Sequence, residues 1–133
     1  MDLAGIDHIT IRTRPQDVDA LRDFYRDVLG LHEGKRAAFR FPGYWMYLGG
    51  KPVVHLAGAL AADAPEPRGP GHTGQFDHVS FHARGIAAVR AHLQARGMKF
   101  AEAPVPGLPL HQIFFHDPVG VKVELTFYDE DAG

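Results

Sequence analysis

Apolar and polar residues follow the same order twice along the 133-residue chain. Residues 5–11 and residues 75–81 alternate between apolar and polar side chains, the period-2 pattern of half-buried strands. Each segment is followed by apolar residues at helical spacing, over residues 18–29 in the first half and residues 86–93 in the second, and a glycine follows each predicted helix. Both halves therefore open with a strand and a helix.

Three further strand-like segments follow each predicted helix. They span residues 37–41, 45–48 and 52–57 in the first half and residues 100–102, 112–116 and 122–127 in the second. A strand, a helix and three strands in each half predict an α+β fold of two βαβββ modules. A module of about 60 residues has too small a core to fold alone. We therefore expect the two modules to pair and form a curved mixed sheet around a cleft.

The segment between the modules is rich in proline and glycine, which predicts an exposed linker or a mobile flap. Because the modules are expected to share a core, we expect a single domain. Its predicted boundaries are about 4–57 for module one, 58–74 for the linker and 75–128 for module two, within residues 1–133.

Composition excludes several classes of protein. The chain has no cysteine, which rules out disulfides and thiolate chemistry. A formal net charge of −2 and a pI near 6.5 argue against nucleic acid as a partner. The longest apolar runs are far too short for a membrane span, and the first residues do not resemble a signal peptide. We therefore expect a cytoplasmic protein that has a small-molecule substrate and contacts neither nucleic acid nor a membrane.

Two histidines and one glutamate form a candidate metal site. His8 and His78 occupy equivalent positions in the first strand of each module, and Glu124 lies in the last strand of module two. Glu124 has an apolar residue on either side, and His8 and His78 are each followed by one, so strand alternation is expected to turn the three side chains toward the face that does not meet the helices. Two imidazoles and one carboxylate leave open positions on a divalent ion. This donor set favours Fe(II) or Mn(II), and it also suits Zn, Ni or Co.

His55 is the repeat equivalent of Glu124. It lies 47 residues after His8, and Glu124 lies 46 residues after His78. We expect His55 to face the same cleft, where a histidine that is neutral near pH 7 suits catalytic proton transfer. A role as a fourth metal ligand stays open, as does a structural role within the sheet.

The motifs together resemble the vicinal oxygen chelate superfamily. The resemblance rests on the paired Asp-His strands, on the segment Phe24–Leu31 with the sequence FYRDVLGL, and on the segment Phe115–Glu124, which ends in the pattern DPxGxxxE. It covers nearly the whole chain. The superfamily includes glyoxalase I, fosfomycin-modifying transferases, epimerases, extradiol dioxygenases and metal-free drug-binding proteins. It implies a metal on His8, His78 and Glu124 and substrates that chelate through neighbouring oxygens, but it implies no single reaction.

Departures from the subfamily patterns rank the reactions. A histidine stands opposite Glu124 in the repeat, where glyoxalase I and the epimerases are expected to use a carboxylate. The acidic C-terminal tail disfavours a phosphonate substrate. These features lead to an extradiol-type dioxygenase with His55 as acid/base, although Phe114 stands where those enzymes are expected to have a tyrosine. A lyase or isomerase that uses the metal as a Lewis acid is the alternative, and a non-catalytic ligand-binding protein is the third.

We expect aromatic and polar side chains from both modules to contact the substrate. The predicted substrate-binding residues are Thr10, Trp45, Tyr47, Gln112 and Phe114. An aromatic cleft suits a planar, oxygenated ligand. The resemblance and the open sheet edges of each module also lead us to expect a homodimer. The sequence leaves open whether facing modules belong to one chain or to two.

Overall fold

The computed structural model describes residues 1–129, so Glu130 and Asp131 of the acidic tail lie outside the described residues. Contacts within the chain divide it into two compact units: unit one is Met1–Glu66, and unit two begins at Pro67. The boundary falls inside the predicted linker. Each unit contains one of the predicted modules, so the two units are described separately.

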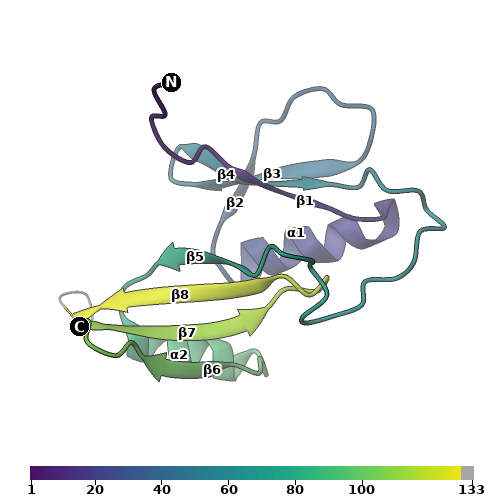
Figure 1. Cartoon of the computed structure of the whole chain (residues 1–133). Helices are drawn as coiled ribbons and strands as arrows, with labels where there is room; N and C mark the ends of the chain where they lie inside the picture. The colour runs from purple at the N-terminus through teal and green to yellow at the C-terminus, as the bar shows by residue number, and fades with distance from the viewer. Residues whose placement is uncertain (130–133) are drawn as a thin grey trace. The chain divides into compact units, whose positions relative to one another are not determined.

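Both units consist of one strand, one helix and three strands (Figure 1). Unit one contains β1 (Ile9–Arg12), a 3₁₀ turn (Pro15–Asp17), α1 (Val18–Asp27), β2 (His32–Gly34), β3 (Gly43–Leu48) and β4 (Lys51–Ala57). Unit two contains β5 (His78–His82), α2 (Ile86–Ala95), β6 (Ala101–Pro104), β7 (Leu110–His116) and β8 (Lys122–Tyr128). The predicted succession of two βαβββ modules is confirmed.

The two sheets have the same topology. Unit one has the strand order β1-β4-β3-β2, and unit two has the order β5-β8-β7-β6. In each sheet the first and last strands of the module are parallel neighbours, and the other pairs are antiparallel. The last strand of each module therefore runs through the sheet interior with a partner on each side, which fixes its register.

Strand alternation in β4 and β8 separates a core face from an open face. In β4, Val54 and Leu56 are each 1% exposed, and they belong to the same core as the apolar stripe of α1. In β8, Val123 and Leu125 are buried in the same way. Residues between these positions must point to the opposite face of the sheet. His55 and Glu124 occupy two such positions.

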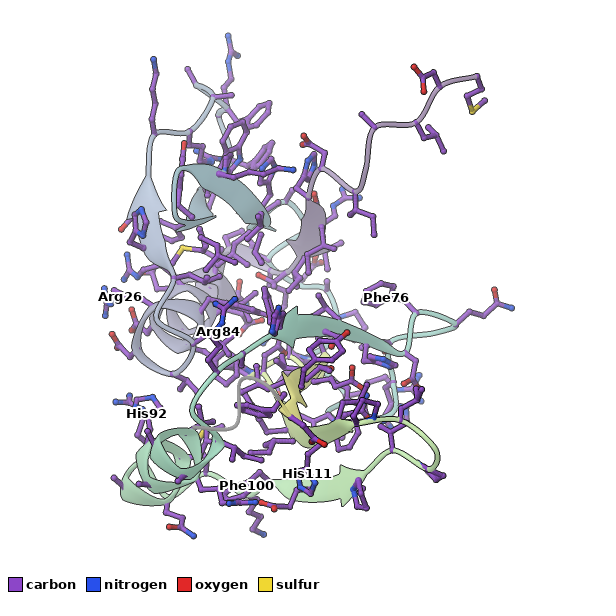
Figure 2. The ribbon with its side chains drawn as sticks, turned by 90° about the vertical axis from the view of Figure 1, so that its left-hand side faces the viewer. Arg26, Phe76, Arg84, His92, Phe100 and His111 are labelled. Carbon is purple, nitrogen blue, oxygen red and sulfur yellow. The ribbon has the colours of Figure 1, made fainter. Side chains whose placement is uncertain are left out.

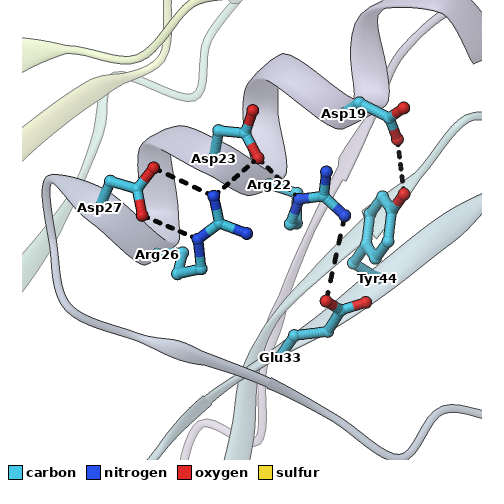
Figure 3. Close-up of polar contacts among 7 residues, drawn as sticks. All are labelled: Asp19, Arg22, Asp23, Arg26, Asp27, Glu33 and Tyr44. Carbon is cyan, nitrogen blue, oxygen red and sulfur yellow. Dashed lines mark hydrogen bonds and ion pairs between the residues drawn. The ribbon is translucent and has the colours of Figure 1, made fainter.

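The outer face of α1 is polar. Arg22 pairs with Asp23 and lies near Glu33 of β2, and Arg26 pairs with Asp27 and Asp23 (Figure 3). Ion pairs this exposed stabilise a fold only slightly. Their arrangement keeps the charged side chains of α1 away from the apolar core.

Tyr44 of β3 also lies on the side of the sheet that carries α1. Its hydroxyl donates a hydrogen bond to Asp19, and the guanidinium of Arg22 lies 4.5 Å from its ring centroid (Figure 3). Tyr44 is therefore a packing residue of the helix face.

The predicted strand over residues 37–41 is also wrong. This segment is a turn, in which the amide of Phe39 donates to the carbonyl of Ala37. The guanidinium of Arg36 then donates to the carbonyl of Phe41 at 2.7 Å. The strand next to β3 is instead the short β2 at His32–Gly34. Alternation of apolar residues predicted a strand here, but a side chain forms the hydrogen bond that a neighbouring strand would otherwise supply.

The predicted linker is irregular and mostly exposed, as expected. Its first part is attached to unit one, because the amide of Leu60 donates to the carbonyl of Thr13 and Gln16 donates to the carbonyl of Ala62. Within residues 1–129, no helix is long and apolar enough to cross a membrane.

The turn between β7 and β8 delivers Glu124 to a fixed position, as the DPxGxxxE pattern predicts. The carboxylate of Asp117 accepts hydrogen bonds from the amides of Val119 and Val121, both at 2.9 Å. Gly120 has a φ of +94°, and a Cβ on this residue would collide with the carbonyl of Gly69. Both the backbone angle and the space therefore require glycine here.

We predict that Gly120→Ala destabilises the protein by about 2–4 kcal/mol, because the variant combines backbone strain with a clash against backbone atoms. Gly97→Ala is the matched control, since Gly97 has a φ of +66° and open space around its Cβ position. The control should cost about 1 kcal/mol. Urea denaturation of both variants measures the difference. Equal losses would show that the contact with Gly69 contributes nothing.

Candidate functional site

The open face of the second sheet centres on Glu124. In the register of the sheet, Glu124 lies between Ser80 of β5 and Phe114 of β7, and Thr126 lies between His82 and Gln112. Neighbours in register share a face, so β5, β7 and β8 together present one polar surface. Alternation along β8 produces this arrangement, as the sequence predicts.

Glu124 is a buried carboxylate that uses only part of its hydrogen-bonding capacity. It is 7% exposed, and its Oε2 accepts a hydrogen bond from the hydroxyl of Thr126 at 3.1 Å. Ser80 lies 2.8 Å from the same hydroxyl and donates to it, because the hydroxyl proton of Thr126 is used on Glu124. This chain orients the carboxylate and leaves Oε1 on the side of His78.

His78 presents one nitrogen to Glu124 and the other to Asp77. Its Nδ1 lies 2.7 Å from the carboxylate of Asp77, and its Nε2 lies 3.6 Å from Oε1 of Glu124. The hydrogen bond from His78, together with the positive charge of Lys122, lowers the pKa of Asp77. An ionised carboxylate only accepts, so Nδ1 carries the proton. In the neutral ring the lone pair is therefore on Nε2, beside Glu124.

His8 repeats this arrangement in unit one. Its Nδ1 lies 2.6 Å from the carboxylate of Asp7, and the hydrogen bond from His8 lowers the pKa of Asp7. The lone pair of the neutral ring is again on Nε2. A carboxylate that holds Nδ1 of a histidine is the usual outer partner of a metal-ligating imidazole, because it fixes the tautomer and raises the basicity of Nε2.

His55 lies between two aromatic rings on the open face of the first sheet. Its ring stacks on His8 with centroids 3.8 Å apart and on Trp45 with centroids 4.0 Å apart. Register explains the contact with Trp45, which lies beside His55 on β3, and it places Thr10 on the other side of His55. The alternation of side chains inferred from the sequence places His55 on the face away from the core, and β4 has this alternation in the structure.

The surroundings of His55 favour its neutral form. Burial lowers the pKa of His55, and the nearby ring of His8 lowers it further. Its Nε2 lies 3.2 Å from the carbonyl of Pro52, which can only accept a hydrogen bond. Nε2 therefore carries the proton, and Nδ1 has the lone pair.

A hollow of about 470 Å³ lies beside this stack within unit one. This volume falls in the range of small-molecule sites. Its lining residues include the proposed catalytic and ligand histidines together with aromatic rings; they are Asp7, His8, Thr10, Arg36, Phe39, Phe41, Trp45, Pro52, His55, Leu56 and Ala57. The hollow therefore has both polar side chains, which can bind or transfer a proton, and apolar walls, which can hold a planar ligand.

The predicted substrate-binding residues are distributed over two sheets. Thr10 and Trp45 line the hollow of unit one. Tyr47 does not line it, because a bulge follows Met46 and the Tyr47 hydroxyl donates to the carbonyl of Lys35. Gln112 and Phe114 lie on the Glu124 face of unit two.

Two further histidines, His111 and His116, lie on opposite faces of β7. His111, visible on β7 in Figure 2, lies 3.2 Å from Glu102, which also pairs with Arg90 of α2. Its register places it on the helix side of the sheet. His116 lies on the Glu124 face and lines a small polar hollow beside Asp77 and Lys122. His111 is therefore a structural residue of the helix side.

Three features of the site escaped the sequence interpretation. The Asp7 and Asp77 partners were visible as a repeated Asp-His pair, but no role followed from their position alone. Thr126, which bonds Glu124, follows it by two residues on β8, and this spacing could have indicated the contact. Arg36 gave no signal, because it lies directly before the segment predicted as a strand.

No single unit holds a complete set of metal ligands. Within the described residues of either unit, three His, Asp or Glu side chains do not gather in a group that fits a metal ion. Unit one brings His8 together with His55, and unit two brings His78 together with Glu124. The predicted triad therefore takes one ligand from unit one and two from unit two.

Comparison with known proteins identifies the family. The sequence model of the Glyoxalase/Bleomycin resistance protein/Dioxygenase superfamily matches residues 5–125. "Glyoxylase I 4" of Arabidopsis thaliana is 30% identical over an alignment of 134 positions, and the alignment covers 97% of this chain and 74% of the plant protein.

Solved structures share the fold. Lactoylglutathione lyase from Agrobacterium tumefaciens matches with a TM-score of 0.69 and 21% identity over 96% of each chain. A mutant of the fosfomycin resistance protein FosX from Listeria monocytogenes matches with a TM-score of 0.70 and 16% identity, covering 96% of this chain and 94% of that one. That structure contains Mn(II) and 1S,2S-dihydroxypropylphosphonic acid. From the match over residues 5–125 we conclude that the chain belongs to the Glyoxalase/Bleomycin resistance protein/Dioxygenase superfamily.

Proposed function

We propose that this protein is a metal-dependent lyase or isomerase of the glyoxalase type. In this proposal His8, His78 and Glu124 hold one divalent ion, and His55 transfers a proton on a small substrate that has neighbouring oxygens. The observation that carries the proposal is that His8 and His78 have the same tautomer. Asp7 and Asp77 hold Nδ1 of the two histidines, so that both present Nε2 for coordination.

The donor pair in unit two fits a divalent ion. Two ligands bound at right angles to one ion, each about 2.1 Å from it, lie roughly 3 Å apart. Nε2 of His78 and Oε1 of Glu124 are 3.6 Å apart, so a small approach brings them to this spacing. Within residues 67–129, no lysine or arginine lies within 4 Å of Glu124. A buried carboxylate without a cation is costly, and a metal would supply the positive charge.

The third ligand comes from module one in this proposal. His8 has the same aspartate partner as His78, and it borders the hollow where a substrate would lie. In the expected homodimer, His8 of the same chain or of a second chain could complete the set. Both arrangements use the same residues, and the homodimer stays a prediction.

The ion would act as a Lewis acid on the neighbouring oxygens of the substrate. Imidazole and carboxylate donors suit several first-row metals. The presence of Mn(II) in the FosX structure supports an ion of this kind. Fe(II), Zn, Ni and Co share the donor preferences, so the identity of the metal stays open.

The residues of unit one have the properties that proton transfer requires. Nε2–H of His55 is held by Pro52, so Nδ1 accepts the proton from carbon and returns it to the adjacent carbon. Stacking on Trp45 and His8 fixes the plane of the ring. Thr10, beside His55 in register, is placed to hydrogen-bond a substrate oxygen.

The relatives favour this reaction over the dioxygenase reaction that the sequence ranked first. The Arabidopsis protein and the Agrobacterium structure both bear glyoxalase-type names. Dioxygenases are named in the description of the superfamily, beside glyoxalases and bleomycin resistance proteins. Phe114 lies next to Glu124 in register, so this position offers no phenol beside the carboxylate. The sequence counted against glyoxalase chemistry because a histidine, and not a carboxylate, stands at position 55. In this proposal His55 itself acts as the base.

We predict that His78→Ala and Glu124→Gln each abolish binding of one divalent ion per site and leave the fold intact. A sheet that is stabilised by its own hydrogen bonds and core does not depend on a metal bound at its surface. Metal content of untagged protein, measured by mass spectrometry after dialysis against Mn(II), tests this. His92→Ala, on the exposed side of α2 (Figure 2), is the control and should retain the metal. Full metal content in Glu124→Gln would remove Glu124 from the ligand set.

We predict that His55→Gln retains the metal and lowers turnover by about 10²–10⁴-fold, which is the usual contribution of a general acid/base group. The assay uses the hemithioacetal of methylglyoxal and glutathione in D₂O and follows both lactoylglutathione and deuterium at the adjacent carbon. His111→Gln, on the opposite face of its sheet, is the matched control and should be unaffected.

Other outcomes of this assay point to other functions. Loss of metal in His55→Gln would make His55 a ligand. Oxygen uptake with catechol, without deuterium exchange, would instead support the dioxygenase reaction. Binding without either activity would favour a ligand-binding protein.

A further inference from the structure

The hollow of unit one is bordered by a positive charge that has no acidic partner. Arg36 lines it, and among residues 1–129 no carboxylate lies within 4 Å of its guanidinium. Asp7 lines the same hollow, but its carboxylate is bonded to His8. The guanidinium of Arg36 therefore lies beside an apolar hollow without a negative partner among these residues.

Most hydrogen-bond donors of Arg36 are also unused. A guanidinium has five N–H donors. Nη2 donates to the carbonyl of Phe41 at 2.7 Å, whereas Nε is buried and has no hydrogen-bond partner among the described residues. A buried donor without a partner is uncommon in folded proteins and points to a missing acceptor.

Packing accounts for the position of Arg36 but not for its charge. The guanidinium lies over the rings of Phe39 and Phe41, 5.4 and 5.2 Å from their centroids, and a Cβ on Gly43 would lie 2.9 Å from Nη2. These contacts hold the side chain in place. Aromatic faces attract a cation, but they supply no acceptor in the plane of the guanidinium. A purely structural role leaves the unpaired Nε unexplained.

We propose that Arg36 binds a carboxylate of the substrate and thereby determines the specificity of the pocket, an inference that rests on the proposed function. A guanidinium matches a carboxylate through two parallel hydrogen bonds. The predicted substrate is an acid with neighbouring oxygens. Its neighbouring oxygens lie near His8, its body lies between Trp45 and the phenylalanines, and its carboxylate meets Arg36. The side chain of Phe39 is 49% exposed, so the ring near the guanidinium is only half packed.

Trp45 reports binding directly. It is the single tryptophan of the chain and lines the same hollow. The probes are protocatechuate, a benzoate with two neighbouring hydroxyl groups, and its neutral carboxamide, which has the same shape. We expect the acid to bind about tenfold or more tightly than the amide, as a charge-assisted hydrogen bond predicts. Calorimetry confirms the affinities obtained from fluorescence.

Three variants separate the charge from packing. In Arg36→Gln the preference for the acid should fall to about one, and in Arg36→Lys it should survive in part because the charge remains. Arg40→Gln, an exposed arginine of the same segment, is the matched control and should keep the full preference. The ratio of two affinities within one variant cancels a general loss of stability, which the melting temperature records separately.

The same titrations on protein stripped of metal distinguish the two proposals. A preference for the acid that persists without metal, and disappears only in Arg36→Gln, would uphold the role of Arg36 even if the metal proposal failed. Equal affinities for acid and amide in the unaltered protein would overturn the role of Arg36, and so would a full preference in Arg36→Gln. Failure of both probes to bind at millimolar concentration would overturn it as well.

Discussion

The alternation of side chains along the two interior strands is the constraint on which the rest of the site depends. Val54 and Leu56 in β4, like Val123 and Leu125 in β8, are buried in the core. Because each strand is held by partners on both sides, it cannot slip by one residue without exposing these side chains. The free energy of core burial therefore fixes the face on which the intervening polar residue lies. The burial of apolar neighbours in the core thus determines where His55 and Glu124 lie.

A second layer of control comes from the carboxylates that hold Nδ1 of His8 and His78. Asp7 and Asp77 fix the tautomers of His8 and His78, so that in the proposed function the coordinating nitrogen of each would be determined before an ion binds. The hydroxyl of Thr126 does the same for the carboxylate of Glu124. These groups reduce the conformational freedom that metal binding would otherwise have to remove. The orientation of His8 in unit one, and that of His78 and Glu124 in unit two, is thereby set within each unit.

The two modules share a fold but have diverged in chemistry. The row that contains Thr10, His55 and Trp45 in unit one corresponds to the row with Ser80, Glu124 and Phe114 in unit two. A hydroxyl and an aromatic ring occupy the same places in both. The central residue differs, because one module has a stacked imidazole where the other has a buried carboxylate. In the proposed function this difference separates proton transfer from metal binding.

The sequence by itself determined the repeat, the order of the elements and the faces of His55 and Glu124, because period-2 alternation and core burial are local properties of each strand. It failed for residues 37–41, where the bond from Arg36 to Phe41 replaces strand pairing. Only the tertiary structure revealed that bond, the stack of His8, His55 and Trp45, and the hollow beside them. Those features join residues far apart in the chain, and the distances between such residues depend on packing that no local pattern encodes.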